Sequence, residues 1–293
     1  MTKTISIRPL ESPADVASAE ELQAVIWQGG EIDVVPGHLI TALGHNGGMA
    51  LGAFDGSRLV GLVIGFLGTD SASPERVAMA RLKHCSHQLG VHPDYQNQGI
   101  GLMLKIAQRD FVMGQGIRLI TWTYDPLLSR NAQLNIRRLG AVCQTYLREA
   151  YGNMRDALNR GVPSDRFQVD WWVTSRRVAS RLGEERPPLD LAHFLSAGAQ
   201  ELNPAHLDED DLSHPCENPE PPRGNLALVE IPSDYLALKE RNLRLALAWR
   251  DQTRSLFENA FAAAYMVTDF VHLAGERLPR SFYVLSHAEA TLG

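Results

Sequence analysis

The sequence has few of the features that mark secreted, membrane-spanning or metal-binding proteins. Its three cysteines, Cys85, Cys143 and Cys216, are an odd number, lie far apart and form no CxxC pair. This pattern excludes a disulfide scaffold and a zinc ribbon and favours a reducing compartment. The longest apolar run, Leu59–Leu67, is far short of the ~20 residues that cross a bilayer, and residues 1–15 lack the apolar core of a signal peptide. We therefore expect a cytoplasmic protein without membrane contact.

Positive charge is also scarce. The 28 Lys and Arg residues against 34 Asp and Glu give a net charge of −6 and a sequence pI near 5.9, so we expect no nucleic-acid partner. What the chain does have is an ordinary globular composition, with 44% hydrophobic and 21% charged residues. Its 293 residues suffice for one large domain or two modest ones.

One stretch, residues 186–222, departs from the rest in composition. Between Arg186 and Arg223 there is no Lys or Arg, while eight acidic residues and seven prolines fall in the same interval. Such a segment does not easily form a packed core. We therefore predict an acidic, proline-rich linker over 186–222, between a domain at 1–185 and a smaller C-terminal module at 223–293.

Hydrophobic periodicity predicts alternating helices and strands. The predicted helices are 12–27, 100–113, 131–139 and 234–265. The predicted strands are 49–54, 59–67, 81–91, 118–123, 142–147, 166–173, 226–231, 266–272 and 282–286. The fold class is therefore α/β (α+β), a mixed sheet flanked by helices, and the C-terminal module has the order β-α-β-β. That module is expected to pack on the sheet or to build a homodimer interface.

The most informative stretch joins the predicted strand 81–91 to the helix 100–113. Proline stops the strand at His92-Pro93, and a polar turn leads into a helix whose first residues are Gly99-Ile100-Gly101-Leu102. Backbone N–H groups at a helix start are unpaired and favour an anion, and glycine lets a phosphate approach the backbone. An ordinary polar turn is the alternative. The turn is neither a Walker loop nor a dinucleotide fingerprint.

Val91-x-Pro93 followed by Gln96-x-x-Gly99-x-Gly101 resembles the acyl-CoA-binding motif of the GNAT superfamily of N-acyltransferases. The resemblance covers roughly residues 5–175 and implies a splayed sheet, with CoA between the fourth and fifth strands and its pyrophosphate at the turn. The implied CoA-binding residues are Leu89, Gly90, Val91, Gln96, Asn97, Gln98, Gly99, Ile100, Gly101, Leu102 and, in the last helix of the family, Asn131.

Three further segments resemble a group of long bacterial GNAT proteins, the predicted acetyltransferases, some of which are linked to N-acylation of amino acids, including succinylation. These segments are 122–136, 151–171 and 229–257. The resemblance implies transfer of an acyl group, here expected to be acetyl, from acyl-CoA to the primary amine of a small molecule, with an amino acid among the candidates. An amino-acid N-succinyltransferase and a CoA-binding module without catalysis remain alternatives.

Acyl transfer to an amine needs a proton acceptor and a proton donor for the leaving thiolate. The segment 81–91 has no Glu, so His87 is the expected base, on the face that strand alternation gives to Cys85, Leu89 and Val91. A histidine that merely lines the cleft is the alternative. Alternation places His84 opposite His87 and leaves at most Cys85 and His87 together, too few ligands for zinc. We therefore expect no metal.

The proton donor is harder to place. The tyrosine that many family members carry before the glycine ending the last helix corresponds to Ile136 here. We expect Tyr124 to replace it, with Tyr146 or water as other candidates and packing at a strand end as the alternative role of Tyr124.

Three residues are expected to bind the acceptor: Trp27, Asp125 and Arg166. The planar fork of Arg166 suits a carboxylate. An ion pair of Arg166 with Asp165 or Asp170 is the alternative, and Trp27, near Gly29-Gly30, could equally be a core residue.

Overall fold

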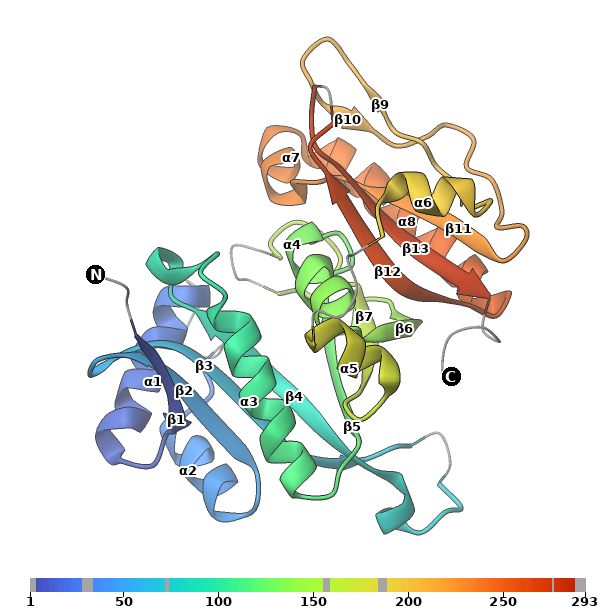
Figure 1. Cartoon of the computed structure of the whole chain (residues 1–293). Coiled ribbons are helices and arrows are strands. Elements are labelled where there is room, and N and C mark those ends of the chain that lie inside the picture. The colour runs from blue at the N-terminus through green and yellow to red at the C-terminus, as the bar shows by residue number, and fades with distance from the viewer. Residues whose placement is uncertain are drawn as a thin grey trace. The chain divides into compact units, whose positions relative to one another are not determined.

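The computed structural model describes residues 4–27, 34–71, 74–154, 159–183, 189–275 and 277–287. The chain forms two compact units (Figure 1). Unit 1 comprises Met1–Trp122 with Met154–Arg160, and unit 2 comprises Thr123–Asn153 with Gly161–Gly293. Unit 2 thus begins well before the linker expected at 186–222, because compact units follow contacts in space that composition does not record.

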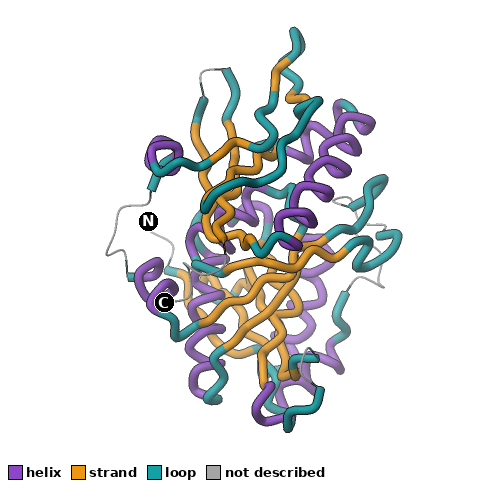
Figure 2. Tube along the Cα trace, turned by 90° about the vertical axis from the view of Figure 1, so that its right-hand side faces the viewer, coloured by secondary structure: helices purple, strands orange, loops and turns teal. Residues whose placement is uncertain are grey.

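Unit 1 is a mixed sheet with helices on both faces (Figure 2). Its strands are β1 (Ile5–Pro9), β2 (Met49–Asp55), β3 (Arg58–Thr69), β4 (Leu82–Val91) and β5 (Leu119–Tyr124), whose last two residues belong to unit 2. Its helices are α1 (Pro13–Trp27), α2 (Gly37–His45) and α3 (Ile100–Gly114), with short 3₁₀ turns at Ala78–Arg81 and Pro93–Tyr95.

The strands of unit 1 follow the order β1-β2-β3-β4-β5. The first three pairings are antiparallel, and β4 with β5 is parallel. One face of the sheet packs its apolar side chains against α1 and α2. The other face packs against α3, through Ile100 and Leu104. Apolar residues on both faces explain why β2 and β3 are near-continuous hydrophobic runs.

The main strands of unit 2 follow the order β7-β6-β12-β13-β11-β8, with parallel and antiparallel pairings. Its strands are β6 (Val142–Leu147), β7 (Arg166–Trp172), β8 (Gln200–Glu201), β11 (Leu226–Ile231), β12 (Tyr265–Leu273) and β13 (Arg280–His287), and a separate hairpin pairs β9 (His206–Leu207) with β10 (Ser213–His214). Its helices are α4 (Ser129–Ala132), the π-helix η4 (Gln133–Arg138), α5 (Arg176–Leu182), α6 (Leu191–Ser196), α7 (Tyr235–Arg241) and α8 (Leu243–Ala262).

The predicted fold class is confirmed, because helices flank a mixed sheet and β11, α7–α8, β12 and β13 follow in the expected β-α-β-β order. Pattern analysis missed β1 and α2. The single helix predicted over 234–265 is wrong: the helix breaks at Asn242, whose backbone is extended and whose side chain accepts the N–H of Leu245. Asparagine competes for backbone hydrogen bonds in this way and favours caps over helix interiors.

Part of the predicted linker also contributes to a packed core. Residues 184–188 lie outside the described ranges, but α6 follows them, and Phe194 and Ala199 are buried against β11, β12 and β13. Within the described ranges, every helix is too short or too polar to span a lipid bilayer.

Candidate active site

The turn between β4 and α3 has the geometry that its glycine predicts. Gly99 precedes the first helical residue with φ +79°, in the left-handed region that favours glycine. No side chain caps the helix there, and a Cβ built on Gly99 would meet nothing within 4 Å. The space beside Gly99 at the start of α3 is therefore open, and the unpaired N–H groups of a helix start favour an anion.

The polar residues before Gly99 fix the shape of this turn. Gln96 donates from its side chain to the carbonyl of Val91 (3.2 Å), and Gln98 donates to the carbonyl of Asp94 (3.0 Å). Asn97 has φ +61°, which asparagine tolerates better than most residues. The structure thus brings the expected CoA-binding residues of unit 1 together at one end of β4 (89–91) and in the adjoining turn (96–102).

The strands β4 and β5 share only two register pairs. His84 pairs with Ile120 and Cys85 with Thr121, and the described residues beyond these two pairs have no further register between the strands. The pairing of β4 with β3, by contrast, extends to Val91. From Ser86 onward, the edge of β4 that faces β5 therefore has no strand paired to it among the described residues, and β4 leads toward the Gly99 turn.

A β-bulge interrupts β4 close to this point. Ile64 pairs with Gln88 and Gly65 pairs with Ser86, so that His87 is an extra residue. Before the bulge, Ser86 faces α3, where it contacts Lys105; after it, Leu89 and Val91 lie in the core on that same face. The expectation that Cys85, His87, Leu89 and Val91 share one face is wrong, because an extra residue shifts the side-chain alternation by one.

The bulge leaves His87 exposed on β4, with its ring 6.0 Å from that of Phe66. Although His87 is exposed, neighbouring atoms remove part of the water around its imidazole, and this desolvation lowers the pKa of His87 below its ordinary value. The imidazole is therefore neutral near pH 7. A neutral, exposed imidazole can accept a proton. Burial also raises the pKa of the neighbouring Cys85 thiol, which makes Cys85 a poor nucleophile.

Sequence analysis missed a buried polar group on the α3 side of β4. Lys105 of α3 donates to Ser86 Oγ (2.8 Å) and to Gln108 Oε1 (3.1 Å), and its ammonium lies 3.6 Å from the ring centre of Trp122 on β5. His84 and Gln108 are in contact at 3.2 Å. Lys105 lies outside the apolar stripe of residues 100, 103, 104, 107 and 111, so periodicity could not have found this cluster.

Tyr124 lies in unit 2 and is poorly suited to donate a proton. Its side chain is buried, and its hydroxyl forms a 3.1 Å hydrogen bond with that of Tyr283, which itself donates to the carbonyl of Pro126. Burial raises the pKa of Tyr124 well above its ordinary value. A weaker acid protonates a thiolate less readily, so Tyr124 forms no part of the mechanism below.

Asp125 and Arg166 belong to one buried ionic group of unit 2. Arg250 of α8, with no exposed surface, holds Asp125 through two hydrogen bonds of 2.8 and 2.6 Å. Arg166 lies 4.0 Å from Asp125 and donates to the backbone carbonyl of Asp165. The guanidinium of Arg166 also lies 5.5 Å from the ring centre of Tyr151, an exposed residue.

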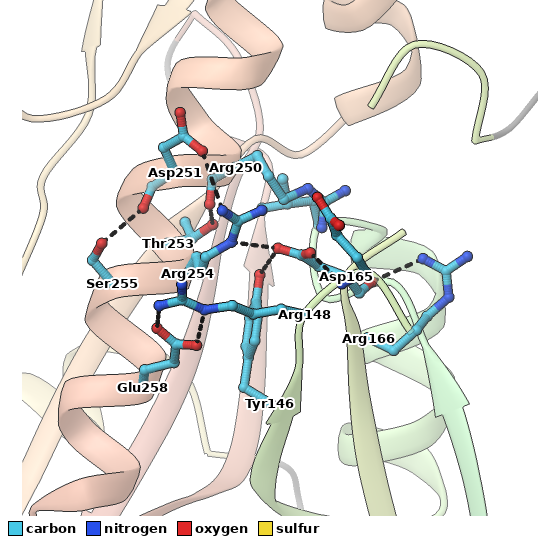
Figure 3. Close-up of polar contacts among 12 residues, drawn as sticks. Tyr146, Arg148, Asp165, Arg166, Arg250, Asp251, Thr253, Arg254, Ser255 and Glu258 are labelled. Atoms are coloured by element: carbon cyan, nitrogen blue, oxygen red, sulfur yellow. Dashed lines mark hydrogen bonds and ion pairs between the residues drawn. The ribbon is translucent and has the colours of Figure 1, made fainter. Parts of the chain in front are cut away.

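The carboxylate of Asp165, by contrast, binds other partners. Arg254 of α8 donates to it at 2.8 Å and Tyr146 of β6 at 2.7 Å, and Figure 3 shows both side chains pointing toward it. Burial acts to raise the pKa of Asp165, but these hydrogen bonds and the N–H of Glu149 outweigh it, so the pKa is lowered. The Asp165 carboxylate is therefore engaged by α8 and β6, whereas the backbone carbonyl of Asp165 accepts a hydrogen bond from Arg166.

The two remaining expected site residues lie in different units. Trp27 ends α1, and its ring packs against Gly90 of β4, where a Cβ would come within 3.0 Å of it; Gly29 and Gly30 lie outside the described residues. Asn131 lies in α4 of unit 2, where its N–H donates to the carbonyl of Leu128. Among the described residues, no group of three His, Cys, Asp or Glu side chains could hold a metal ion.

Unit 2 also has a groove of about 1130 Å³, bounded by the β9–β10 hairpin, α7 and the β12–β13 turn. Its buried Glu230 accepts two hydrogen bonds from Arg280. On its rim, Arg277 forms an ion pair with Asp211. These four charges are therefore paired within the groove.

No model of a known protein family matches the chain, and no curated protein matches it. Among solved structures, it is similar to the ribosomal-protein-S18-alanine N-acetyltransferase from Escherichia coli, with 14% identity and a TM-score of 0.43, covering 58% of this chain and 94% of that one. It is also similar to Arabidopsis thaliana NAA60 in complex with acetyl-CoA, with 17% identity and a TM-score of 0.46, covering 58% of this chain and 99% of that one. A third similar structure is aminoglycoside 6'-acetyltransferase type Ii, with 16% identity and a TM-score of 0.43, covering 59% of this chain and 99% of that one. At such scores these likenesses carry no inference about activity, which rests instead on the residues of the site.

Proposed function

We propose that this protein is an acyl-CoA-dependent N-acyltransferase of the GNAT type, which transfers an acyl group directly to the primary amine of a small molecule. One observation carries the proposal: β4 and β5 separate after two register pairs, and β4 leads to helix α3, which has Gly99 as its N-cap. An elongated ligand with a pyrophosphate fits this arrangement, because the open edge of β4 can bind its arm and the start of α3 its phosphates.

In this proposal the CoA arm lies along residues 89–91, and the pyrophosphate lies at 96–102. The acyl thioester then reaches the bulge, where His87 accepts a proton from the acceptor amine. The amine nitrogen attacks the thioester carbonyl, and the carbon–sulfur bond breaks to release CoA. Holding both substrates in one complex supplies much of the rate enhancement, since attack becomes intramolecular.

The acceptor is proposed to carry a carboxylate that Arg166 binds. Arg166 is buried, and Asp125, held by Arg250, orients its guanidinium from 4.0 Å. A planar guanidinium suits a carboxylate, which it can bind with two parallel hydrogen bonds. Asp125 acts here by positioning Arg166, and Trp27 supports β4 through Gly90.

The direct test measures thiol release from acetyl-CoA and succinyl-CoA with a panel of amino acids, their amides and polyamines, together with calorimetry of CoA binding. We expect CoA to bind and thiol release to depend on an amine. Binding without turnover for any pair would instead support a CoA-binding module, and absence of both would overturn the proposal. A preference for succinyl-CoA would favour the succinyltransferase alternative.

A further inference from the structure

The proposed function lacks a proton donor for the leaving thiolate, since Tyr124 is buried against Tyr283. The cluster of Ser86, Lys105 and Trp122 lies where such a donor is needed. Ser86 is the first residue of β4 beyond its last pair with β5, and Trp122 occupies the same place on β5. Lys105 contacts both, at 2.8 Å to Ser86 Oγ and 3.6 Å to the Trp122 ring, at the point where the strands part.

The contacts of Lys105 suit an ammonium group that passes on a proton. Its Nζ donates to Ser86 Oγ and Gln108 Oε1 and lies against the Trp122 ring, so that three neighbours match three N–H bonds. Because Ser86 Oγ accepts from Lys105, its own hydrogen remains for donation to another group. Both side chains are nearly fully buried, at 2% and 5% exposure, which favours a fixed path for a proton over exchange with bulk water.

We propose that Lys105, acting through the hydroxyl of Ser86, supplies the proton that the leaving CoA thiolate takes up. This inference rests on the proposed function and adds to it a proton donor, Ser86, and a residue that acts through Ser86, Lys105. As the carbon–sulfur bond breaks, the sulfur takes the hydroxyl proton of Ser86, and Ser86 takes one from Lys105. The products are CoA thiol, an intact serine and an uncharged Lys105. A solvent proton that enters through Ser86 after CoA leaves restores the ammonium.

The surroundings of Lys105 strengthen it as an acid. Burial lowers its pKa well below the ordinary value of a lysine, with Cys85 on β4 acting in the opposite direction. Burial and Lys105 together lower the pKa of His84 to about 4, so His84 is uncharged near neutral pH, and its buried Nδ1 has no hydrogen-bond partner. The charge of Lys83, on the same strand, acts to lower the pKa of Cys85. Among the described residues, no carboxylate forms an ion pair with Lys105.

The test compares kcat, KM for acyl-CoA and the pH profile of wild type, Ser86→Ala, Ser86→Thr and Lys105→Met, with Lys83→Met as a matched control. We expect Ser86→Ala and Lys105→Met to lower kcat by ~10²–10⁴-fold with KM little changed. Ser86→Thr, which keeps the hydroxyl, should restore most of the rate, and Lys83→Met should resemble wild type. The wild-type rate should fall as pH rises through the pKa of Lys105, and Lys105→Met should lack this fall.

If Ser86→Ala turns over within about threefold of wild type, the relay is wrong even though the enzyme is an acyltransferase. The same holds if Lys105→Met keeps the decline at high pH. If Lys105→Met fails to fold, the comparison of Ser86→Ala with Ser86→Thr decides. The first variant removes only the hydroxyl group, and the second keeps the hydroxyl and adds a methyl group. A wild type that neither binds CoA nor releases thiol overturns the proposed function itself, and the relay with it.

Discussion

His87 reaches solvent because of the backbone around it. As the extra residue of the bulge in β4, it leaves the alternation that places Ser86 and Leu89 against α3. Arg166, in contrast, is buried, and the neighbouring charge of Asp125 fixes the position of its guanidinium. Each role proposed for these residues makes a separate prediction.

Replacing His87 by Ala should lower kcat by ~10²–10⁴-fold with little change in CoA affinity, because the proton acceptor is lost and the phosphate turn is intact. The wild-type rate should rise with pH through the pKa of His87, which partial burial holds below its ordinary value. Steady-state kinetics across pH 5–9 checks both. His38→Ala, an exposed histidine of α2, is the control. An unchanged rate in His87→Ala across this range would leave His87 a structural residue.

Replacing Arg166 by Met should raise KM for a free amino acid by roughly 10–150-fold, because a charge-assisted hydrogen bond contributes about 1.5–3 kcal/mol. The amide of the same amino acid lacks the carboxylate and should be much less affected. Arg148→Met, which removes an exposed ion pair with Glu258, is the matched control. Equal losses on the charged and uncharged acceptors would show that Arg166 supports the fold through Asp125 and Asp165.

At the scale of elements, helix α3 has two roles that its sequence separates by position. The backbone N–H groups of its first turn, after Gly99, are proposed to bind a phosphate, whereas the side chains of Ile100 and Leu104 pack on the sheet. Gly99 is needed for its left-handed backbone, and the space beside it is open. The glycine therefore provides both the turn and access for a phosphate.

Replacing Gly99 by Glu should abolish CoA binding, since the side chain brings bulk and negative charge to the phosphate site and strains a backbone with φ +79°. Gly99→Asn, which tolerates this conformation without charge, should retain part of the affinity. Gly114→Glu makes the same change at the other end of α3, where a Cβ also meets nothing within 4 Å, and should bind CoA as wild type does. Calorimetry giving equal affinity for Gly99→Glu and wild type would remove this turn from the site.

At the scale of the whole molecule, the two units differ in how acid affects them. Burial lowers the pKa of His84 in unit 1 to about 4, against an ordinary value near 6.5. The unfolded chain therefore binds the proton first as pH falls, and the stability that His84 contributes is complete above pH ~6.5 and lost toward pH 4. In unit 2, the lowered pKa of Asp165 contributes stability that is lost only as pH falls below the ordinary range of a carboxyl.

We therefore expect unit 1 to lose roughly 2 kcal/mol of unfolding free energy between pH 7.5 and 5.0 through His84 alone. Urea unfolding at both pH values, with hydrogen exchange to assign each unit, measures this loss. His84→Asn should remove most of the pH dependence, and His38→Asn should keep it. If unit 2 proves the more acid-sensitive between these pH values, the burial of His84 does not govern acid stability.

Local pattern was enough for much of this protein. Apolar periodicity predicted α1, α3 and most strands, because helices and strands that bury one face must repeat with their own period. The turn 96–102 was also predictable, because a glycine at the N-cap and a helix N-terminus are features of the local sequence. The β-α-β-β order of residues 226–287 followed likewise.

Other features depend on partners distant in sequence. The bulge that exposes His87 exists only against β3, and the Lys105 cluster needs Ser86, 19 residues away, and Trp122 on β5. The same holds for Asp125, whose partner Arg250 is 125 residues distant, and for the bond of Tyr124 to Tyr283. Sequence determined which residues could do chemistry here. Tertiary structure decided which of them are buried, paired or exposed, because pKa, charge balance and access depend on neighbours that only folding supplies.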